Sequence, residues 1–457
     1  MNEIFIDQLL KLAISPYGLI GVVAGLWLIT QANRSRQLAW LLVSLCGFTA
    51  SLSKFKDDFI TEPPILVFPL EQLRDVGRPL TIALLGLLIV LALRTPKNWR
   101  RGVFPRPINY LLLVQLVILL KTLAYGSVTF AFLAILTFTG MAFMLRMGPG
   151  RWLQDDENFK LAVWAVAMVG VIFIVANTYQ YLIDPYAVTF VHGRFLGTTG
   201  NPQHAAVLLA ATIPSFMFLF ENQPKWNWVK LSWLVSLISV MYYLLLTGSR
   251  TGVLMGAVVI LFFYRQNSGA WFRLGLGLTI LLAVFLTFSS PEHFGLGGID
   301  PSVSRRFTST NDTRSEVSAA LWNGFISNPF FGTPLRGDRL GYGENSWLAA
   351  GATLGLAGFI PMLMVGWECL KLIWQLNQIS NRRPQYFFQV SSVVAGLASL
   401  LVGSFFEAFL LGNLTFSLLA FLIYLFMGQY LVEVDQIQTH YSTIESNFVE
   451  PPGVNNY

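Results

Sequence analysis

Long apolar segments alternate with short polar ones along almost the whole chain. Segments that could cross, or nearly cross, a bilayer with a hydrocarbon core of ~30 Å recur about thirteen times. They occupy residues 12–30, 37–53, 79–93, 107–125, 127–145, 159–178, 204–220, 229–247, 251–264, 271–288, 345–368, 388–411 and 413–432. The pattern predicts an all-α, polytopic integral membrane protein with about twelve to fourteen transmembrane helices.

Composition agrees with this fold class and excludes others. The chain is 54% hydrophobic and only 12% charged, which leaves too little polar surface to coat a soluble globule. Its net charge of +6 comes from basic residues in short loops between apolar segments, as membrane topology requires. The stacking platforms and basic grooves of a nucleic-acid-binding protein are missing, so we expect no nucleic-acid partner. Cys46 and Cys369 lie in or beside apolar segments, which favours packed thiols.

The basic residues also predict an orientation. The strongest cluster lies in the loop 94–106, which holds five basic residues and no acid, and we expect this loop to be cytoplasmic. If the spans alternate, the loops 179–203, 248–251 and 289–344 face outward and meet on one side of the membrane. Other basic pairs or groups then share the cytoplasmic side: Arg34 and Arg36, Arg146 and Arg151, Arg265 and Arg273, and Lys371, Arg382 and Arg383.

The segment 289–344 is the longest polar interval between two membrane-length segments. Within it, Thr313-Arg314-Ser315-Glu316 fits the capping-box pattern, so a helix should begin near Arg314 and end at Asn328-Pro329. One apolar stripe follows helical spacing: Val317, Ala320, Leu321, Gly324 and Phe325. We therefore expect an amphipathic helix that lies on an apolar surface.

Three arginines on the outward side are candidates for binding a diphosphate, because a guanidinium group stays charged and donates in pairs. Arg250 sits where one apolar span turns into the next, and a charge beside hydrocarbon is a functional candidate. Arg194 precedes the flexible turn that ends at Asn201, and Arg314 lies in the first turn of the loop helix. Structural roles stay open for each: Arg250 could reach lipid headgroups, Arg194 could pair with lipid phosphate or Asp184, and Glu316 could balance Arg314.

Two acids stand at the outward ends of apolar segments. Glu344 directly precedes Asn345, where partial burial could raise the pKa of a carboxyl enough for it to act as a base. It could equally be a helix-start acid that the helix dipole favours. Glu407 could pair with one of the arginines. The four His are scattered and no HExxH is present, so we expect a site without metal or cofactor.

Three motifs together resemble the O-antigen ligase and polymerase superfamily. They are R-F-L-G-T-T-G-N-P-Q-H-A at 194–205, L-T-G-S-R-T-G at 246–252, and the outward loop with T-R-S-E-V-S-A-A-L-W-N-G-F-I-S-N-P-F-F-G-T-P-L. Their order and spacing also match, and the resemblance covers roughly residues 160–370. It implies a bacterial inner-membrane enzyme that moves a glycan from undecaprenyl diphosphate to an acceptor hydroxyl at the periplasmic face, among membrane lipids.

By this resemblance Arg194, Arg250 and Arg314 hold the diphosphate leaving group. Ligases of this family usually place a histidine before the Asn that precedes the next span, and here Glu344 occupies that position. We therefore expect Glu344, Arg250 and Arg194 to be catalytic. The residues expected to bind substrate are Arg314, Asn345, Asn201 and Glu407.

Because Glu344 stands where ligases usually have a histidine, we favour a polysaccharide polymerase over a ligase that attaches the glycan to lipid A-core. Outside this class, a transporter or flippase of lipid-linked glycans and a non-catalytic lipid-docking subunit remain as alternatives. The expected organisation has four parts: N-terminal transmembrane helices (1–158), a ligase/polymerase-like core (159–370) that includes the periplasmic loop 289–344, C-terminal transmembrane helices (371–432), and a disordered cytoplasmic tail (433–457).

Overall fold

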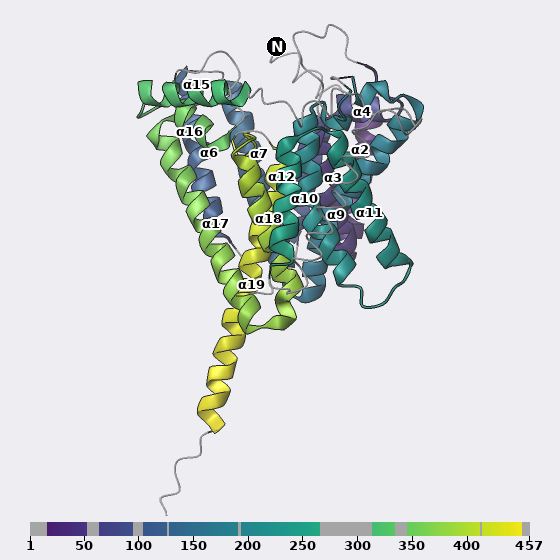
Figure 1. Ribbon diagram of the computed structural model, residues 1–457. Helices are drawn as coiled ribbons and strands as arrows, with labels where there is room; N and C mark the ends of the chain where they lie inside the picture. The colour runs from purple at the N-terminus through teal and green to yellow at the C-terminus, as the bar shows by residue number, and fades with distance from the viewer. Residues whose placement is uncertain are drawn as a thin grey trace, which may run out of the picture.

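The computed structural model is all-helical, and its apolar helices are long enough to cross a membrane (Figure 1), which confirms the prediction of an all-α, polytopic membrane protein. The number of spans and the periplasmic position of the loop 289–344 stay predictions. It describes residues 16–52, 64–94, 104–125, 128–190, 193–265, 313–333, 345–411 and 414–449. The helices before the long loop are α2 (Pro16–Arg34), α3 (Arg36–Ser51), α4 (Leu70–Asp75), α5 (Gly77–Arg94), α6 (Arg106–Tyr125), α7 (Val128–Met147), α8 (Pro149–Trp152), α9 (Asp156–Ile183), η1 (Tyr186–Val188), η2 (Gly197–Thr199), α10 (Pro202–Glu221), α11 (Trp228–Leu246) and α12 (Arg250–Phe263). Those that follow are α15 (Thr313–Ser327), α16 (Ser346–Leu354), α17 (Leu356–Arg382), η3 (Pro384–Tyr386), α18 (Phe387–Ser404) and α19 (Phe416–Val449).

Within the described residues, 8 helices are long and apolar enough to cross a membrane: α5, α6, α9, α10, α11, α17, α18 and α19. Four further helices, α2, α3, α7 and α12, coincide with predicted spans. The predicted span 271–288 lies outside the described residues.

Two predicted spans differ from the helices that form. The segment 345–368 is not one helix, because the chain breaks at Gly355 between α16 and α17, and α17 then continues to Arg382. The apolar stripe on α17 persists through Leu376 and Ile379, which are buried, while polar residues on its other face lower the local hydropathy. Further on, α18 ends at Ser404, so Glu407 lies in the turn that follows and not inside a span.

The C-terminal tail also differs from the prediction. Residues 433–449, which we expected to be disordered, continue α19 as a helix beyond the bundle (Figure 1). Arg382 and Arg383 both pair with Asp435, at 3.1 and 2.7 Å, and so hold α19 against the end of α17. These contacts prolong a helix that composition alone made a poor candidate. Residues 450–457 lie outside the described part.

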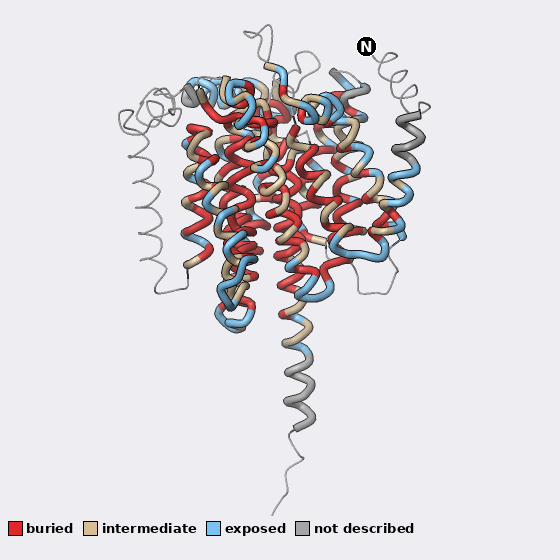
Figure 2. The backbone as a smooth tube through the Cα atoms, turned by 90° about the vertical axis from the view of Figure 1, so that its right-hand side faces the viewer, coloured by how far each residue is buried: buried red, intermediate tan, exposed pale blue. Residues whose placement is uncertain are grey.

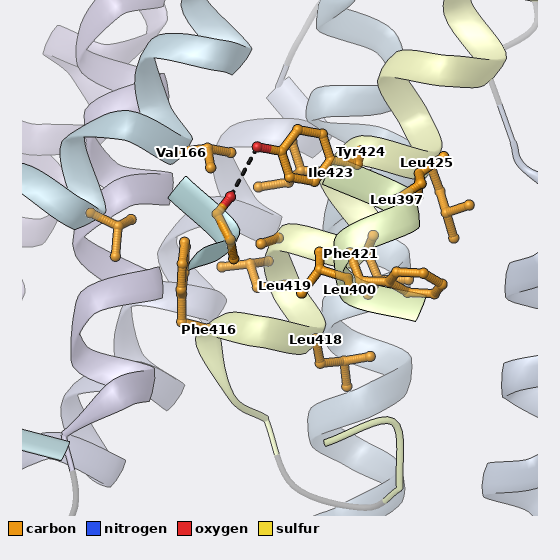
Figure 3. Close-up of a cluster of buried hydrophobic side chains, with 14 of the residues drawn as sticks. Val166, Leu397, Leu400, Phe416, Leu418, Leu419, Phe421, Ile423, Tyr424 and Leu425 are labelled. Carbon is orange, nitrogen blue, oxygen red and sulfur yellow. Dashed lines mark hydrogen bonds between the residues drawn. The ribbon is translucent and has the colours of Figure 1, made fainter. Parts of the chain in front are cut away.

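Buried positions gather in the middle of the bundle (Figure 2). Among the described candidate spans, α10, α18 and α19 are buried over the largest share of their length. Tyr424 of α19 lies in this core with its hydroxyl 3.0 Å from the Ser215 hydroxyl of α10 (Figure 3), and it also donates to the carbonyl of Ala211. A Cβ atom at Gly396 would come within 2.6 Å of the Tyr424 ring. The three helices therefore approach closely, and the Tyr424 hydroxyl of α19 pairs with groups of α10. Cys46 and Cys369 are buried free thiols, as expected.

The helix predicted in the long loop is confirmed as α15, which lies across the end of the bundle rather than along it (Figure 1). It packs on α16 and α17 through Phe325, whose ring lies 5.3 Å from that of Phe359. Val317 and Ala320 of the predicted stripe are exposed instead, so α15 uses a narrower face than the sequence indicated.

Contacts among the basic loops place them at one end of the bundle, which we call the basic end. Arg36, at the start of α3, lies 3.5 Å from Asp155 before α9, and Arg146 stacks over Phe104 before α6. After α12, Arg265 donates to the hydroxyl of Ser391 near the start of α18, and burial lowers the pKa of its guanidinium to about 10. We call the opposite end, where α10, α12 and α16 begin, the site end.

Candidate functional site

Arg194 lies in an irregular segment that connects α9 to α10 and folds back onto the turn between α11 and α12. The amide of Phe195 donates to the carbonyl of Leu246 at 3.0 Å. The Nε of Arg194 donates to the carbonyl of Thr247 at 2.8 Å, and the residue is only 6% exposed. One edge of the guanidinium group is thus fixed by the backbone of the second motif, which brings the first two sequence motifs into contact.

The turn after Arg194 is shaped by Asn177 of α9. Its side-chain oxygen accepts from the amide of Thr198 at 2.8 Å, and its nitrogen donates to the carbonyl of Phe173 at 2.8 Å. Gly197 begins this turn with φ of 55°, a left-handed conformation that glycine tolerates best. A Cβ atom there would lie 2.7 Å from the Asn177 side-chain oxygen. Asn177 and Gly197 together set the path of the Arg194 segment.

Replacement of Gly197 by alanine is therefore expected to destabilise the protein by about 1–3 kcal/mol, because the side chain combines a strained backbone with a steric clash. Thermal unfolding of the purified protein in detergent would measure this as a lower midpoint. Gly86→Ala in α5 is a matched control, since nothing lies within 4 Å of a Cβ atom there. An unchanged midpoint for Gly197→Ala would show that this turn does not hold Arg194 as described.

Arg250 opens α12 next to the same turn. Ser249 caps the helix by accepting from the amide of Gly252 at 3.2 Å, and Arg250 is exposed. Gly252 lies so close to Ala206 that a Cβ atom would come within 2.6 Å of the Ala206 Cβ. The start of α12 is therefore packed against the first turns of α10, and Arg250 follows closely in the chain after Thr247, whose carbonyl Arg194 contacts.

Asn201 and Asn345 are both helix caps. The Asn201 side chain accepts from the amide of Gln203 at 2.8 Å at the start of α10. Asn345 accepts from the amides of Trp347 and Leu348 at 2.8 and 3.0 Å at the start of α16. Their side-chain oxygens thus stabilise the helices that border the site, in addition to any contact with substrate.

Glu407 is buried and lies beside the start of α16. Its backbone carbonyl accepts from the Ser346 hydroxyl at 2.7 Å, and Trp347 donates to the Ser404 hydroxyl at 2.8 Å. At the preceding turns of α18, the Ser399 hydroxyl donates to the carbonyl of Met255 in α12 at 3.2 Å. This chain of contacts places the Glu407 turn and the start of α16 at the same end of the bundle as Arg250.

The structure describes only the backbone of one predicted site residue, Arg314, and does not describe another, Glu344. The backbone of Arg314 lies in the first turn of α15, as expected. Glu344 lies outside the described residues, directly before the cap of α16. Among the parts of the chain that are described, no three His, Cys, Asp or Glu side chains gather in a way that could hold a metal ion.

The helices α10, α12 and α16 all begin at the site end, and each helix start carries a partial positive charge. With Arg194 and Arg250 beside two of these starts, the local field favours an anion. Neither a scan against protein-family models nor a search of curated proteins gives a match. Functional inference therefore depends on the chemistry of this end.

Sequence reasoning missed Lys121 of α6. This residue is only 7% exposed, and its ammonium group contacts the chain between α15 and α16. The available signal was its position as the one charged residue between Arg106 and Tyr125, in an otherwise apolar helix.

Proposed function

We propose that this protein is an integral membrane glycosyltransferase that moves a glycan from a polyprenyl diphosphate to an acceptor hydroxyl. The observation that carries the proposal is the pairing of Arg194 with the Thr247 carbonyl, which puts two arginines from separate motifs at one turn beside the starts of α10 and α12. Paired donors and helix starts are suited to a diphosphate. The motif resemblance supports the same substrate class, with the site facing the periplasm of the bacterial inner membrane.

In the proposed reaction, the acceptor oxygen attacks the anomeric carbon of the donor glycan and inverts its configuration. The new glycosidic bond forms as the bond from the anomeric carbon to the phosphate oxygen breaks. Arg194, Arg250 and Arg314 neutralise the charge that builds on the departing diphosphate, and Glu344 takes the proton of the acceptor hydroxyl. Because Glu344 replaces the histidine usual in ligases, the proposed acceptor is another glycan chain, as in a polymerase.

One observation favours a transporter of lipid-linked glycans as the second candidate. The α16–α17 helix is broken at Gly355, and Lys121 lies against the break. Transporters often build substrate sites from discontinuous helices with ionisable groups beside them. The arginine cluster at the end of the bundle, rather than within it, supports the enzyme.

Incubation of the purified full-length protein with undecaprenyl-diphosphate glycan tests the proposal. Lengthened glycans support a polymerase, and transfer to lipid A-core supports a ligase. Movement of the unaltered lipid across proteoliposome membranes, with no transfer product, would replace the enzyme by the transporter.

The proposed topology predicts that the site end is accessible from outside the cell. Tyr186, 64% exposed near the end of α9, and Lys225, exposed in the turn between α10 and α11, lie at opposite ends. In intact spheroplasts, an impermeant thiol reagent should label Tyr186→Cys and not Lys225→Cys, and both should react after lysis. The buried Cys46 and Cys369 should stay silent. Labelling of Lys225→Cys alone from outside would invert the topology and move the site to the cytoplasm.

A further inference from the structure

The ammonium group of Lys121 meets three backbone carbonyls from a part of the chain more than 200 positions away in sequence. Nζ lies 2.5 Å from the carbonyl oxygen of Phe331 and 2.7 Å from that of Thr333, and it also donates to the carbonyl of Thr353. An ammonium group has three N–H donors, so every proton of Lys121 has an acceptor. This is a complete shell for a charge held in a membrane helix.

Those carbonyls are available because two segments are irregular at the same place. The helix α16 ends at Leu354, and the break at Gly355 leaves its last carbonyls without partners in α17. The amide of Thr333 donates to the carbonyl of Ala352 at 2.8 Å, and the ammonium group of Lys121 donates to the carbonyl of Thr353. The negative end of the α16 dipole faces the ammonium charge, which adds to the attraction.

The segment after α15 is pressed against this break. The amide of Leu356, the first residue of α17, donates to the carbonyl of Pro329 at 2.6 Å. A Cβ atom at Gly332 would lie 2.4 Å from the carbonyl carbon of Thr353, and one at Gly355 would lie 2.4 Å from that of Phe330. The two backbones therefore touch directly, and Lys121 bridges them from the side of α6.

We infer that Lys121 is a positioning residue of the site end: its ammonium group locks the arm formed by residues 313–333 onto the α16–α17 break. The lock fixes α16, whose first residues carry Asn345 and the Ser346 contact to the Glu407 turn. It also fixes α15, whose first turn contains Arg314. The role in catalysis rests on the proposed function, whereas the lock itself does not.

Lys121→Ala removes the propylammonium portion of the side chain, and n-propylammonium ion can restore it from solution. Spin labels attached at Asn323→Cys on α15 and Tyr186→Cys near α9 measure the position of the arm. The distance between the two labels is determined by electron–electron double resonance. Both positions are exposed. We expect one narrow distance distribution with Lys121, a broad one in Lys121→Ala, and a narrow one again when propylammonium is added. In the unlabelled protein, kcat/KM should fall about 10²-fold in Lys121→Ala, the scale expected for a misplaced site, and recover with the same ion.

Three controls separate the lock from general stability. Propanol, which has the size of propylammonium without its charge, should not narrow the distribution. Lys230→Met should change neither readout, because Lys230 donates to a single carbonyl, that of Gln223 at 2.9 Å, at the basic end. If Lys121→Ala does not fold, Lys121→Met keeps the apolar volume and should give the broad distribution.

The outcomes for the two proposals are distinct. A narrow distribution in Lys121→Ala or Lys121→Met overturns the lock even if the protein transfers glycans. Absence of glycan transfer by the unmodified protein, together with propylammonium-dependent narrowing in Lys121→Ala, keeps the lock and removes the proposed function.

Discussion

Glu344→Gln is expected to lower turnover by about 10²–10⁴-fold while leaving the fold and donor binding intact, because the amide cannot accept the proton of the acceptor hydroxyl. The effect should appear in kcat, measured with purified protein and undecaprenyl-diphosphate glycan at saturating donor. Glu344→His should recover part of the rate, since imidazole is the base usual in the ligases that the motifs resemble.

The contrary outcome is equally clear. If Glu344 only favours the start of α16 through the helix dipole, Glu344→Gln should cost less than ~1 kcal/mol of stability and leave turnover nearly unchanged. Glu316→Gln is a suitable control, because Glu316 is an exposed acid in the first turn of α15 that could show the same small dipole effect. Normal turnover in Glu344→Gln would leave the arginines as the remaining catalytic candidates.

Arg194→Lys is expected to lower kcat about 10²-fold although the charge is kept, a loss comparable to that of one oxyanion-stabilising donor. Arg194 is buried, and its Nε donates to the Thr247 carbonyl. A lysine has one nitrogen and cannot satisfy the carbonyl and donate in pairs to a diphosphate at once. Steady-state kinetics with varied donor concentration would measure the change.

Arg36→Lys is the matched control for this exchange. Arg36 is exposed at the basic end and makes a long 3.5 Å contact with Asp155, so its replacement should leave kcat unchanged. Equal losses in both variants would point to general destabilisation, and wild-type turnover in Arg194→Lys would remove Arg194 from the reaction.

The sequence predicted features whose cause is local or repeated. Apolar length located most helices, and the capping pattern at Thr313 located α15. The spacing of Asn201 and Asn345 before apolar runs also has a local cause, which is the N-cap each one forms.

Features that depend on distant contacts were not predictable from local sequence. The break at Gly355 exists because the backbone after α15 is pressed into it, and α19 is prolonged past residue 432 where Arg382 and Arg383 hold Asp435. The partners of Lys121 could not be predicted for the same reason. They are three backbone carbonyls, and no side-chain pattern in the sequence indicates which carbonyls will accept a hydrogen bond.

The helix α12 is short, and its length has a consequence for how a lipid could approach. Its 14 residues rise about 21 Å, against a hydrocarbon thickness of ~30 Å. A span with such a hydrophobic mismatch thins the bilayer around it or leaves its end submerged below the headgroups. On the proposed function, a polyprenyl carrier could then present its diphosphate to Arg250 at headgroup depth, with its chain still among the lipid tails. The energetic cost of drawing the carrier out of the membrane would be avoided.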